Sequence, residues 1–153
     1  MPLLLCRFHD NGVRRMQAAA ICSSAILAAI AVVNFYWAAG GEAGKAGAVP
    51  SRSGKAMFKP KAASTALVGL VLLGMAGLIA GAAGLVPAPW PARALHLACW
   101  PLAIVFLARA VGDFRYVGFF KRARDSIFAT RDTLFYAPLC LALAALITIV
   151  AMG

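Results

Sequence analysis

Residues 16–41 read MQAAAICSSAILAAIAVVNFYWAAGG and contain no charged side chain. A helix needs about 20 predominantly apolar residues to cross the hydrocarbon core of a bilayer, so this run predicts a membrane-spanning helix at about 17–38. Tyr36 and Trp37 stand at its end, where the aromatic side chains of membrane helices meet the water interface. The run is therefore suited to lipid rather than to water.

A cleaved secretory signal peptide is the alternative explanation of this first run. Arg14 and Arg15 would form its basic region, and the alanine-rich stretch its apolar region. The bulky side chains of residues 34–37, however, stand where a cleavage site needs small ones. We therefore expect the run to remain in the protein as a membrane helix.

A second uncharged run covers residues 62–92 and predicts a helix at about 64–86. It should end before Pro87, Pro89 and Pro91, because closely spaced prolines cannot sustain the hydrogen-bond ladder of a helix. These prolines predict a tight turn into the next helix.

Two further apolar runs predict helices at about 92–111 and 133–152. Pro138 falls in the first two turns of the last helix and predicts a local kink. The ionisable side chains of these runs stand near the helix ends, namely Arg93, His96, Arg109 and Asp132, the last as a helix N-cap.

The composition of the whole chain agrees with these runs. It is 63% hydrophobic and 13% charged, whereas a soluble domain averages about 45–50% apolar and about 25% charged residues. We therefore expect one all-α domain over residues 1–153, an antiparallel up-down bundle of four transmembrane helices with a short interfacial segment between the third and fourth. It should be a multi-pass protein of a bacterial inner membrane.

The net charge of +10 is distributed unevenly between the two ends of such a bundle. Four spans place the first and third loops on one side and both termini on the other. Ten basic residues belong to the loop side: Lys45, Arg52, Lys55, Lys59, Lys61, Arg115, Lys121, Arg122, Arg124 and Arg131. Four belong to the terminal side: Arg7, Arg14, Arg15 and Arg93. The positive-inside rule then places both loops in the cytoplasm, although Arg14 and Arg15 favour the opposite orientation.

The segment 109–139, RAVGDFRYVGFFKRARDSIFATRDTLFYAPL, carries most of the candidate polar chemistry. Arg109 and Asp113 are four residues apart and would share one helix face. They could form the floor of a pocket for a polar substrate or a lipid headgroup, or simply an ion pair that closes the helix end. The ion pair is the simpler explanation.

Aromatic and basic residues alternate in the middle of this segment. Such a pattern suits a stretch lying in the membrane interface, with Phe side chains in the lipid and cations at the phosphates. Lys121, Arg122 and Arg124 are therefore candidates for contact with anionic headgroups. Membrane lipids are the expected partners, and nucleic acid is not.

Other ionisable groups point to structural roles. Asp125 and Asp132 could act as an acid and a base, but Arg124 and Arg131 have the same spacing and favour mutual ion pairs. His96 could relay protons, although a bond to backbone or water is the simpler expectation. The four cysteines form no C-x-x-C pair, and no nucleotide, metalloprotease or hydrolase motif is present. We expect no metal and no cofactor.

Small and polar residues within the spans predict helix packing. Gly77 and Gly81 form a G-x-x-x-G pattern, which lets two backbones approach closely within the bundle or between copies of a homo-oligomer. Asn34 has no water to bond inside lipid, so a bond to a neighbouring helix is expected, with ligand contact as the alternative.

Several stretches together resemble a known family. They are YWAAGG at 36–41, Pro50 with FKP at 58–60, RAVGDFRYVGFFK at 109–121, and Asp132-Thr133 with YAPLC at 136–140. The chain is thereby similar to the uncharacterised bacterial family of small four-span membrane proteins classed as a domain of unknown function. The resemblance extends from the first helix nearly to the end of the chain. It implies the topology and a membrane location, and it supplies no activity.

We therefore expect a multi-pass membrane protein, more consistent with a non-catalytic role than with an enzyme. The predicted working face is a polar pocket or lipid-contacting surface made by Trp37, Arg109, Asp113, Arg115, Asp132 and Tyr136. An intramembrane enzyme acting on a lipid or small amphiphile is the first alternative, and a small oligomeric transporter or channel is the second.

Overall fold

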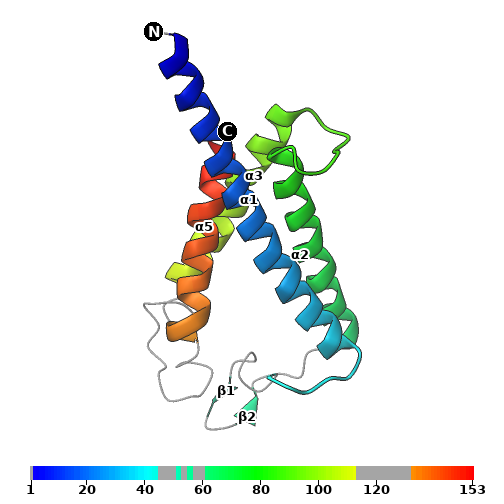
Figure 1. Cartoon of the computed structure of the whole chain (residues 1–153). Coiled ribbons are helices and arrows are strands. Elements are labelled where there is room, and N and C mark those ends of the chain that lie inside the picture. Colours follow the sequence, from blue (N-terminus) through cyan, green and yellow to red (C-terminus); the bar gives the residue numbers. More distant parts are fainter. Residues whose placement is uncertain (1, 45–50, 53–54, 57–60, 113–131) are drawn as a thin grey trace.

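Four long helices make up most of the computed structural model, which describes residues 2–44, 51–52, 55–56, 61–112 and 132–153. They are α1 (Pro2–Ala38), α2 (Ala62–Ala82), α3 (Ala92–Val111) and α5 (Ala137–Ala151), and the π-helix η2 (Asp132–Tyr136) leads directly into α5 (Figure 1). Within the first loop, β1 (Ser51–Arg52) pairs antiparallel with β2 (Lys55–Ala56). Apart from this small pairing, which the sequence did not signal, the described fold is all-α.

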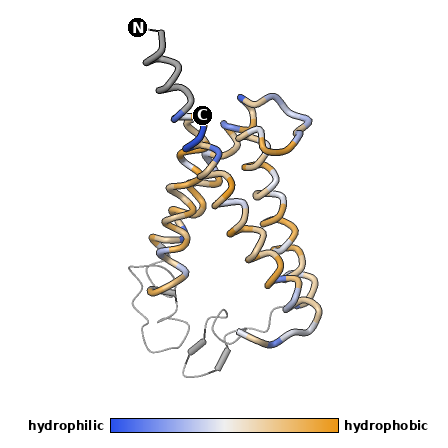
Figure 2. Tube along the Cα trace, viewed as in Figure 1, coloured by the Kyte–Doolittle hydropathy of each residue, from blue (hydrophilic) through white to orange (hydrophobic). Residues whose placement is uncertain are grey.

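Each of the four helical segments is long and apolar enough to cross a membrane. The candidate spans are Asn11–Ala38, Ala62–Ala82, Ala92–Val111 and Leu134–Ala151, with hydropathies of 2.1, 2.2, 1.8 and 2.4. Figure 2 shows hydrophobic residues along the full height of these helices. The expectation of four apolar helices is confirmed by their length and composition.

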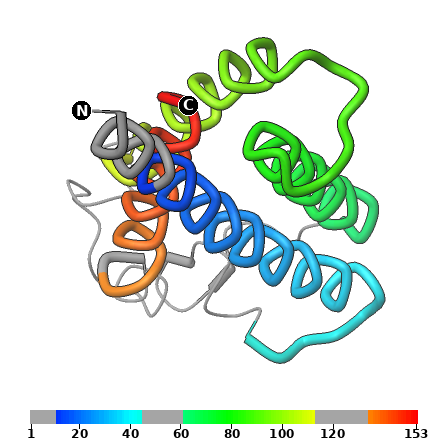
Figure 3. The backbone as a smooth tube through the Cα atoms, turned by 45° about the horizontal axis from the view of Figure 1, so that its top comes forward, coloured from blue at the N-terminus to red at the C-terminus, as the bar shows by residue number. Residues whose placement is uncertain are grey.

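The helices are arranged as two pairs, α1 with α2 and α3 with α5. The pairs meet at the end of the molecule that holds the C-terminus, where α1 also packs on α5 and α2 on α3. Toward the other end they diverge, as Figures 1 and 3 show from two directions. The ends of α1 and α3 and the starts of α2 and η2 all lie at this diverging end.

The core lies where the two pairs meet. Leu27, Ile79, Cys99, Leu143 and Ile147 have no exposed surface there. Many of the other buried residues are alanines, including Ala19, Ala20 and Ala82. Short side chains let helix backbones approach closely, which is how helices associate where lipid removes the usual hydrophobic driving force.

Helices α1 and α2 pack along their length, and two of their contacts show how closely they approach. The Ser24 Oγ donates a hydrogen bond to the Ala76 carbonyl at 3.0 Å. Nearer the diverging end, the ring of Phe35 lies against Gly69, where an added Cβ would come within 2.9 Å of the ring. A larger residue at position 69 would therefore require the Phe35 ring to move.

Glycines in a left-handed conformation end both α1 and α2. After α1, the Gly40 and Gly41 N–H groups donate to the carbonyls of Trp37 and Tyr36 at 3.2 and 2.9 Å. After α2, the Gly84 and Leu85 N–H groups donate in the same pattern to Gly81 and Ala80 at 3.0 and 2.9 Å. These bonds form two Schellman caps, with φ of 101° at Gly40 and 67° at Gly84.

The helix boundaries differ from the sequence prediction in two places. Helix α1 begins at Pro2 rather than near residue 17, so it extends beyond its apolar run. Helix α2 ends at Ala82 rather than near 86, because the cap at Gly84 ends it before the prolines do. The π-helix η2 ends two residues before Pro138: proline lacks an N–H and its ring crowds the carbonyl four residues earlier, which suits a wider turn there, and the expected kink stays a prediction.

A glycine substitution series tests the capping geometry. Gly84→Ala should lower the free energy of unfolding in micelles by about 1 kcal/mol or more, because alanine is strained at positive φ. The matched control is Gly77→Ala. Gly77 lies within α2, the helix that Gly84 caps, and an added Cβ there meets no atom within 4 Å. That change should be neutral or stabilise by up to about 1 kcal/mol. Equal losses in both variants would contradict the assignment.

Candidate functional site

The predicted polar residues that the structure describes lie toward the diverging end of the molecule. Trp37 is in the last turn of α1, on one helix pair, whereas Arg109 and Tyr136 belong to the other pair. All three are partly buried. Asp132 is the first residue of η2. The remaining candidates lie outside the described residues: Asp113, Arg115, Lys121, Arg122 and Arg124. The shared polar pocket therefore stays a prediction.

Trp37 is hydrogen-bonded to the segment that follows α1. Its indole Nε1 donates to the Ala43 carbonyl at 2.8 Å. The ring of Tyr36 covers Gly41 so closely that any Cβ there would collide with it. The two aromatic side chains thus hold residues 41–44 against the helix end, a structural role that accounts for both without a ligand.

Arg109 stands two residues before the end of α3. The helix stops at Gly112, which has φ of 86° and donates its N–H to the Ala108 carbonyl at 2.8 Å. The Arg109 Nη1 has almost no exposed surface. Part of this guanidinium is therefore removed from solvent at the end of α3.

His96 joins α3 to the end of α5. Its Nδ1 lies 2.7 Å from the Val150 carbonyl. The Val150 carbonyl also accepts from the Gly153 N–H at 3.2 Å, so the imidazole provides its second bond, and this acceptor requires the hydrogen to be on Nδ1. The expected bond of this histidine to backbone is confirmed, and it fixes the contact between two helices.

The polar side chains of α1 divide between two roles. Asn34 Nδ2 donates to the Ile30 carbonyl at 2.9 Å and Ser23 Oγ to the Ala19 carbonyl at 2.7 Å, both on their own helix. We expected the Asn34 side-chain amide to donate to a neighbouring helix, but it donates to a carbonyl of α1 itself. Ser24, which the sequence analysis did not single out, makes the bond to α2 instead.

The two glycines of the G-x-x-x-G pattern lie one turn apart on the same face of α2, but their surroundings differ. Gly81 is buried, and a Cβ there would lie 3.0 Å from the Ala88 Cβ and 3.6 Å from the Leu95 side chain. Gly77 is exposed and has open space around it. Gly81 thus serves packing against the turn into α3 and the first residues of α3.

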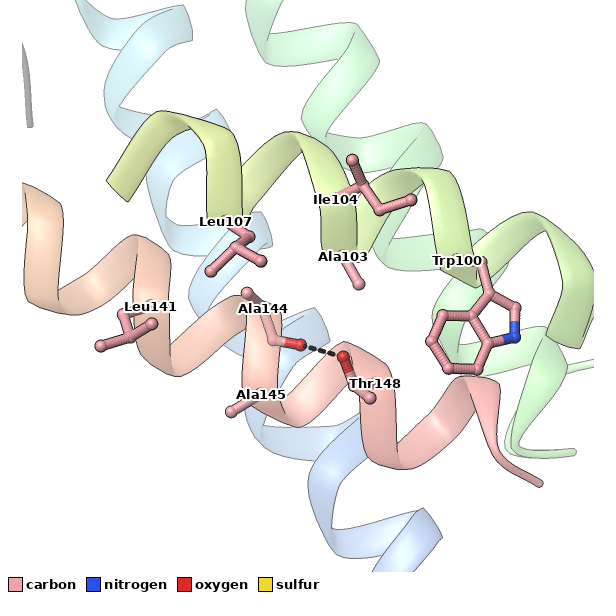
Figure 4. Close-up of a pocket in the computed structure, with 8 residues that line it drawn as sticks. All are labelled: Trp100, Ala103, Ile104, Leu107, Leu141, Ala144, Ala145 and Thr148. Atoms are coloured by element: carbon pink, nitrogen blue, oxygen red, sulfur yellow. Dashed lines mark hydrogen bonds between the residues drawn. The ribbon is translucent and has the colours of Figure 1, made fainter. Parts of the chain in front are cut away.

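An apolar groove of about 270 Å³ runs between α3 and α5 on the outer surface. Figure 4 shows the small side chains of Ala103, Ala144 and Ala145 beside larger ones. The larger lining residues are Trp100, Ile104, Leu107, Leu141 and Thr148. The Thr148 hydroxyl donates to the Ala144 carbonyl at 2.8 Å, so its polarity is satisfied within α5.

Little in the sequence signalled this groove. The alternation of alanines with bulky residues on α3 and α5 is visible, but it matches ordinary helix packing equally well. Within the described part of the chain, no three His, Cys, Asp or Glu side chains gather where they could hold a metal. Of the cysteines described, Cys99 is buried in the core, whereas Cys22 is exposed on α1, and neither forms a disulfide.

These features define a class of protein: in the described part of the chain helices predominate, and four of them are apolar and long enough to cross a membrane. The chain belongs to the family described as "Protein of unknown function (DUF3995)", whose model matches residues 27–147. The match runs from the middle of α1 to near the end of α5, so the resemblance seen in the sequence is confirmed. Comparison with curated proteins and with solved structures found no match.

The bond from His96 to Val150 can be tested by substitution. His96→Ala should lower the unfolding free energy in micelles by about 0.6 kcal/mol and at most about 2, the range for hydrogen bonds between membrane helices. Thr148→Val is the control, because it removes a hydroxyl bonded only within its own helix. It should change stability little. If both variants unfold like the unmodified protein, the imidazole contributes nothing to the contact.

Proposed function

We propose that this protein is an integral membrane protein of a bacterial cytoplasmic membrane, with four antiparallel spans and basic first and third loops that contact anionic headgroups in the cytoplasm. No catalytic step forms part of the proposal. The surface chemistry of the helices and the placement of the charged segments support it.

The outward faces of the helices support insertion in lipid. Large apolar side chains are exposed on all four, including Val32, Leu70, Leu97, Ile104 and Phe135, each at least 59% exposed. Monomeric soluble proteins rarely expose contiguous apolar patches of more than a few hundred Å². A bilayer gives these side chains an apolar environment, while the helices satisfy their own backbone groups.

The single observation that carries the proposal is the common location of the loop attachments. Gly44 and Lys61 flank the undescribed parts of the first loop, and Gly112 and Asp132 flank the third; all four lie toward the diverging end (Figure 1). Ten of the fifteen basic residues belong to these two loops. A basic residue close to an anionic membrane surface contributes about 1 kcal/mol, so this end should attract negatively charged lipid and remain in the cytoplasm.

Reporter fusions test the orientation. Alkaline phosphatase fused after Gly153 should be active and green fluorescent protein at the same position dark, because the termini then lie outside the cytoplasm. Exchanging Lys45, Lys55 and Lys59 for glutamine should weaken this orientation, since the bias follows the Lys and Arg of short loops. The opposite reporter pattern in the unmodified protein would refute the proposed topology.

Tryptophan quenching tests the headgroup contact. We compare a protein that keeps only Trp37 with one that keeps only Trp90, the other tryptophans being phenylalanine. Trp37 lies in the last turn of α1, at the basic end, and Trp90 lies in the turn between α2 and α3, at the opposite end. In phosphatidylcholine vesicles, brominated phosphatidylglycerol should quench Trp37 more than brominated phosphatidylcholine does.

The same comparison contains its control. Trp90, measured in a protein that also carries R93Q, should show a smaller difference between the two brominated lipids, because only three basic residues, Arg7, Arg14 and Arg15, then belong to its side. The preference at Trp37 should also decrease with salt, since exposed charges are screened. Equal quenching of Trp37 by both lipids would remove the support for anionic contact, whatever the orientation.

A further inference from the structure

We propose that the groove between α3 and α5 binds one acyl chain of a single anionic phospholipid, whose phosphate is held by Arg93 at the opposite end of the molecule from the basic loops. The inference rests on the proposed membrane insertion. It concerns a different surface from the loop contacts and a different leaflet.

The lining of the groove selects a hydrocarbon occupant. Seven of its eight residues are aliphatic or aromatic. The hydroxyl of the eighth, Thr148, already donates a hydrogen bond to the Ala144 carbonyl. Apart from the indole N–H of Trp100, the lining offers a polar ligand no free partner, and burying an unbonded polar group costs free energy. A dry apolar cavity of about 150 Å³ admits benzene; the groove, at about 270 Å³, therefore has room for part of one acyl chain.

The charge at one end of the groove identifies the rest of the ligand. Arg93 precedes Trp100 by seven residues, two helical turns, so it lies on the same face of α3 as the groove. At 1.5 Å of rise per residue the two Cα atoms are about 10 Å apart along the axis. Along α3 the cation Arg93 therefore comes first and the apolar groove follows. A phospholipid has the same order along the membrane normal, with its phosphate outside and its acyl chains inside.

Arg93 is available for such a phosphate. Its side chain is exposed, and no carboxylate in the described part of the chain pairs with it. Glu42, the acidic residue whose side-chain surroundings are described, follows α1 near the diverging end of the molecule. Arginine suits the site because its planar guanidinium can donate two parallel hydrogen bonds to a phosphate.

His96 positions the two walls of the groove between these contacts. It lies one turn after Arg93 on α3, and its bond to Val150 holds the end of α5 against α3. Trp100 and Thr148 stand one turn further along, at that end of the groove. The width of the groove near Arg93 is therefore set by a hydrogen bond between helices rather than by loose contact.

The test uses the full chain, with Trp100 as its only tryptophan, in phosphatidylcholine vesicles. Brominated phosphatidylglycerol should quench Trp100 more strongly than brominated phosphatidylcholine at the same mole fraction. R93Q should reduce the relative affinity for phosphatidylglycerol by about fivefold, the factor equivalent to about 1 kcal/mol for one basic residue near the surface. R15Q, an exposed basic residue at the same end on α1, should leave the preference unchanged.

A second pair of variants tests the acyl chain. Ala145 lines the groove and is exposed, so A145F should fill the groove and reduce quenching by both lipids. Ala142 is exposed on α5 but does not line the groove, and A142F should leave quenching unchanged. Because both changes lie on the outer surface, neither should alter folding, which thermal unfolding in micelles checks.

Each other outcome overturns the inference in a distinguishable way. Equal loss of preference in R93Q and R15Q would indicate general surface charge rather than a site. Loss of quenching by both lipids as the protein-to-lipid ratio rises would indicate that a second copy fills the groove. If neither brominated lipid quenches Trp100 or Trp37, membrane insertion itself fails, and the proposed function fails with it.

Discussion

The two helix pairs share a buried core at one end of the molecule only, and the rest of the structure depends on this constraint. Leu27 of α1, Ile79 of α2 and Ile147 of α5 are completely buried there, and small residues around them let the backbones approach. Away from this core the pairs diverge, as Figure 1 shows. The helix ends that carry the basic loops are therefore spread apart, whereas those near the C-terminus are drawn together.

Hydrogen bonds between helices reinforce this arrangement sparingly. Among the hydrogen bonds described, Ser24 of α1 donates to a backbone carbonyl of α2, and His96 of α3 donates to a backbone carbonyl of α5. Ser23, Asn34 and Thr148 bond within their own helices. Because lipid offers no hydrogen-bonding partner, polar groups in a span are satisfied inside the protein or not at all.

The two ends of the molecule offer lipid different chemistry. The loop end gathers charge on segments attached to separate helix pairs, which suits contact with many headgroups at once. At the other end, the proposed site combines one cation, Arg93, with an apolar groove, which suits a single lipid molecule bound through both its phosphate and an acyl chain. The family is described as of unknown function. The difference in chemistry between the two ends distinguishes the proposed general contact of the loops with the membrane surface from the proposed site for one lipid.

The amino-acid sequence by itself determined the number of helices, their approximate positions, the family and the unequal distribution of charge. These follow from local properties: the length of an apolar run, a proline or glycine that ends it, and the count of basic residues in each loop. The range predicted for the third helix coincides with α3 for this reason, whereas α2 ended earlier because the cap at Gly84 depends on backbone conformation.

Only the tertiary structure decided which faces of the helices meet. Neighbouring residues on a helix differ by about 100° in direction, so the rotation of α1 alone makes Ser24 rather than Ser23 face α2. Gly77 and Gly81 share one face of α2, and only the packing decided that Gly81 lies against Ala88 and Leu95 whereas Gly77 meets open space. The groove between α3 and α5 likewise depends on residues far apart in the chain, since no single helix contains it.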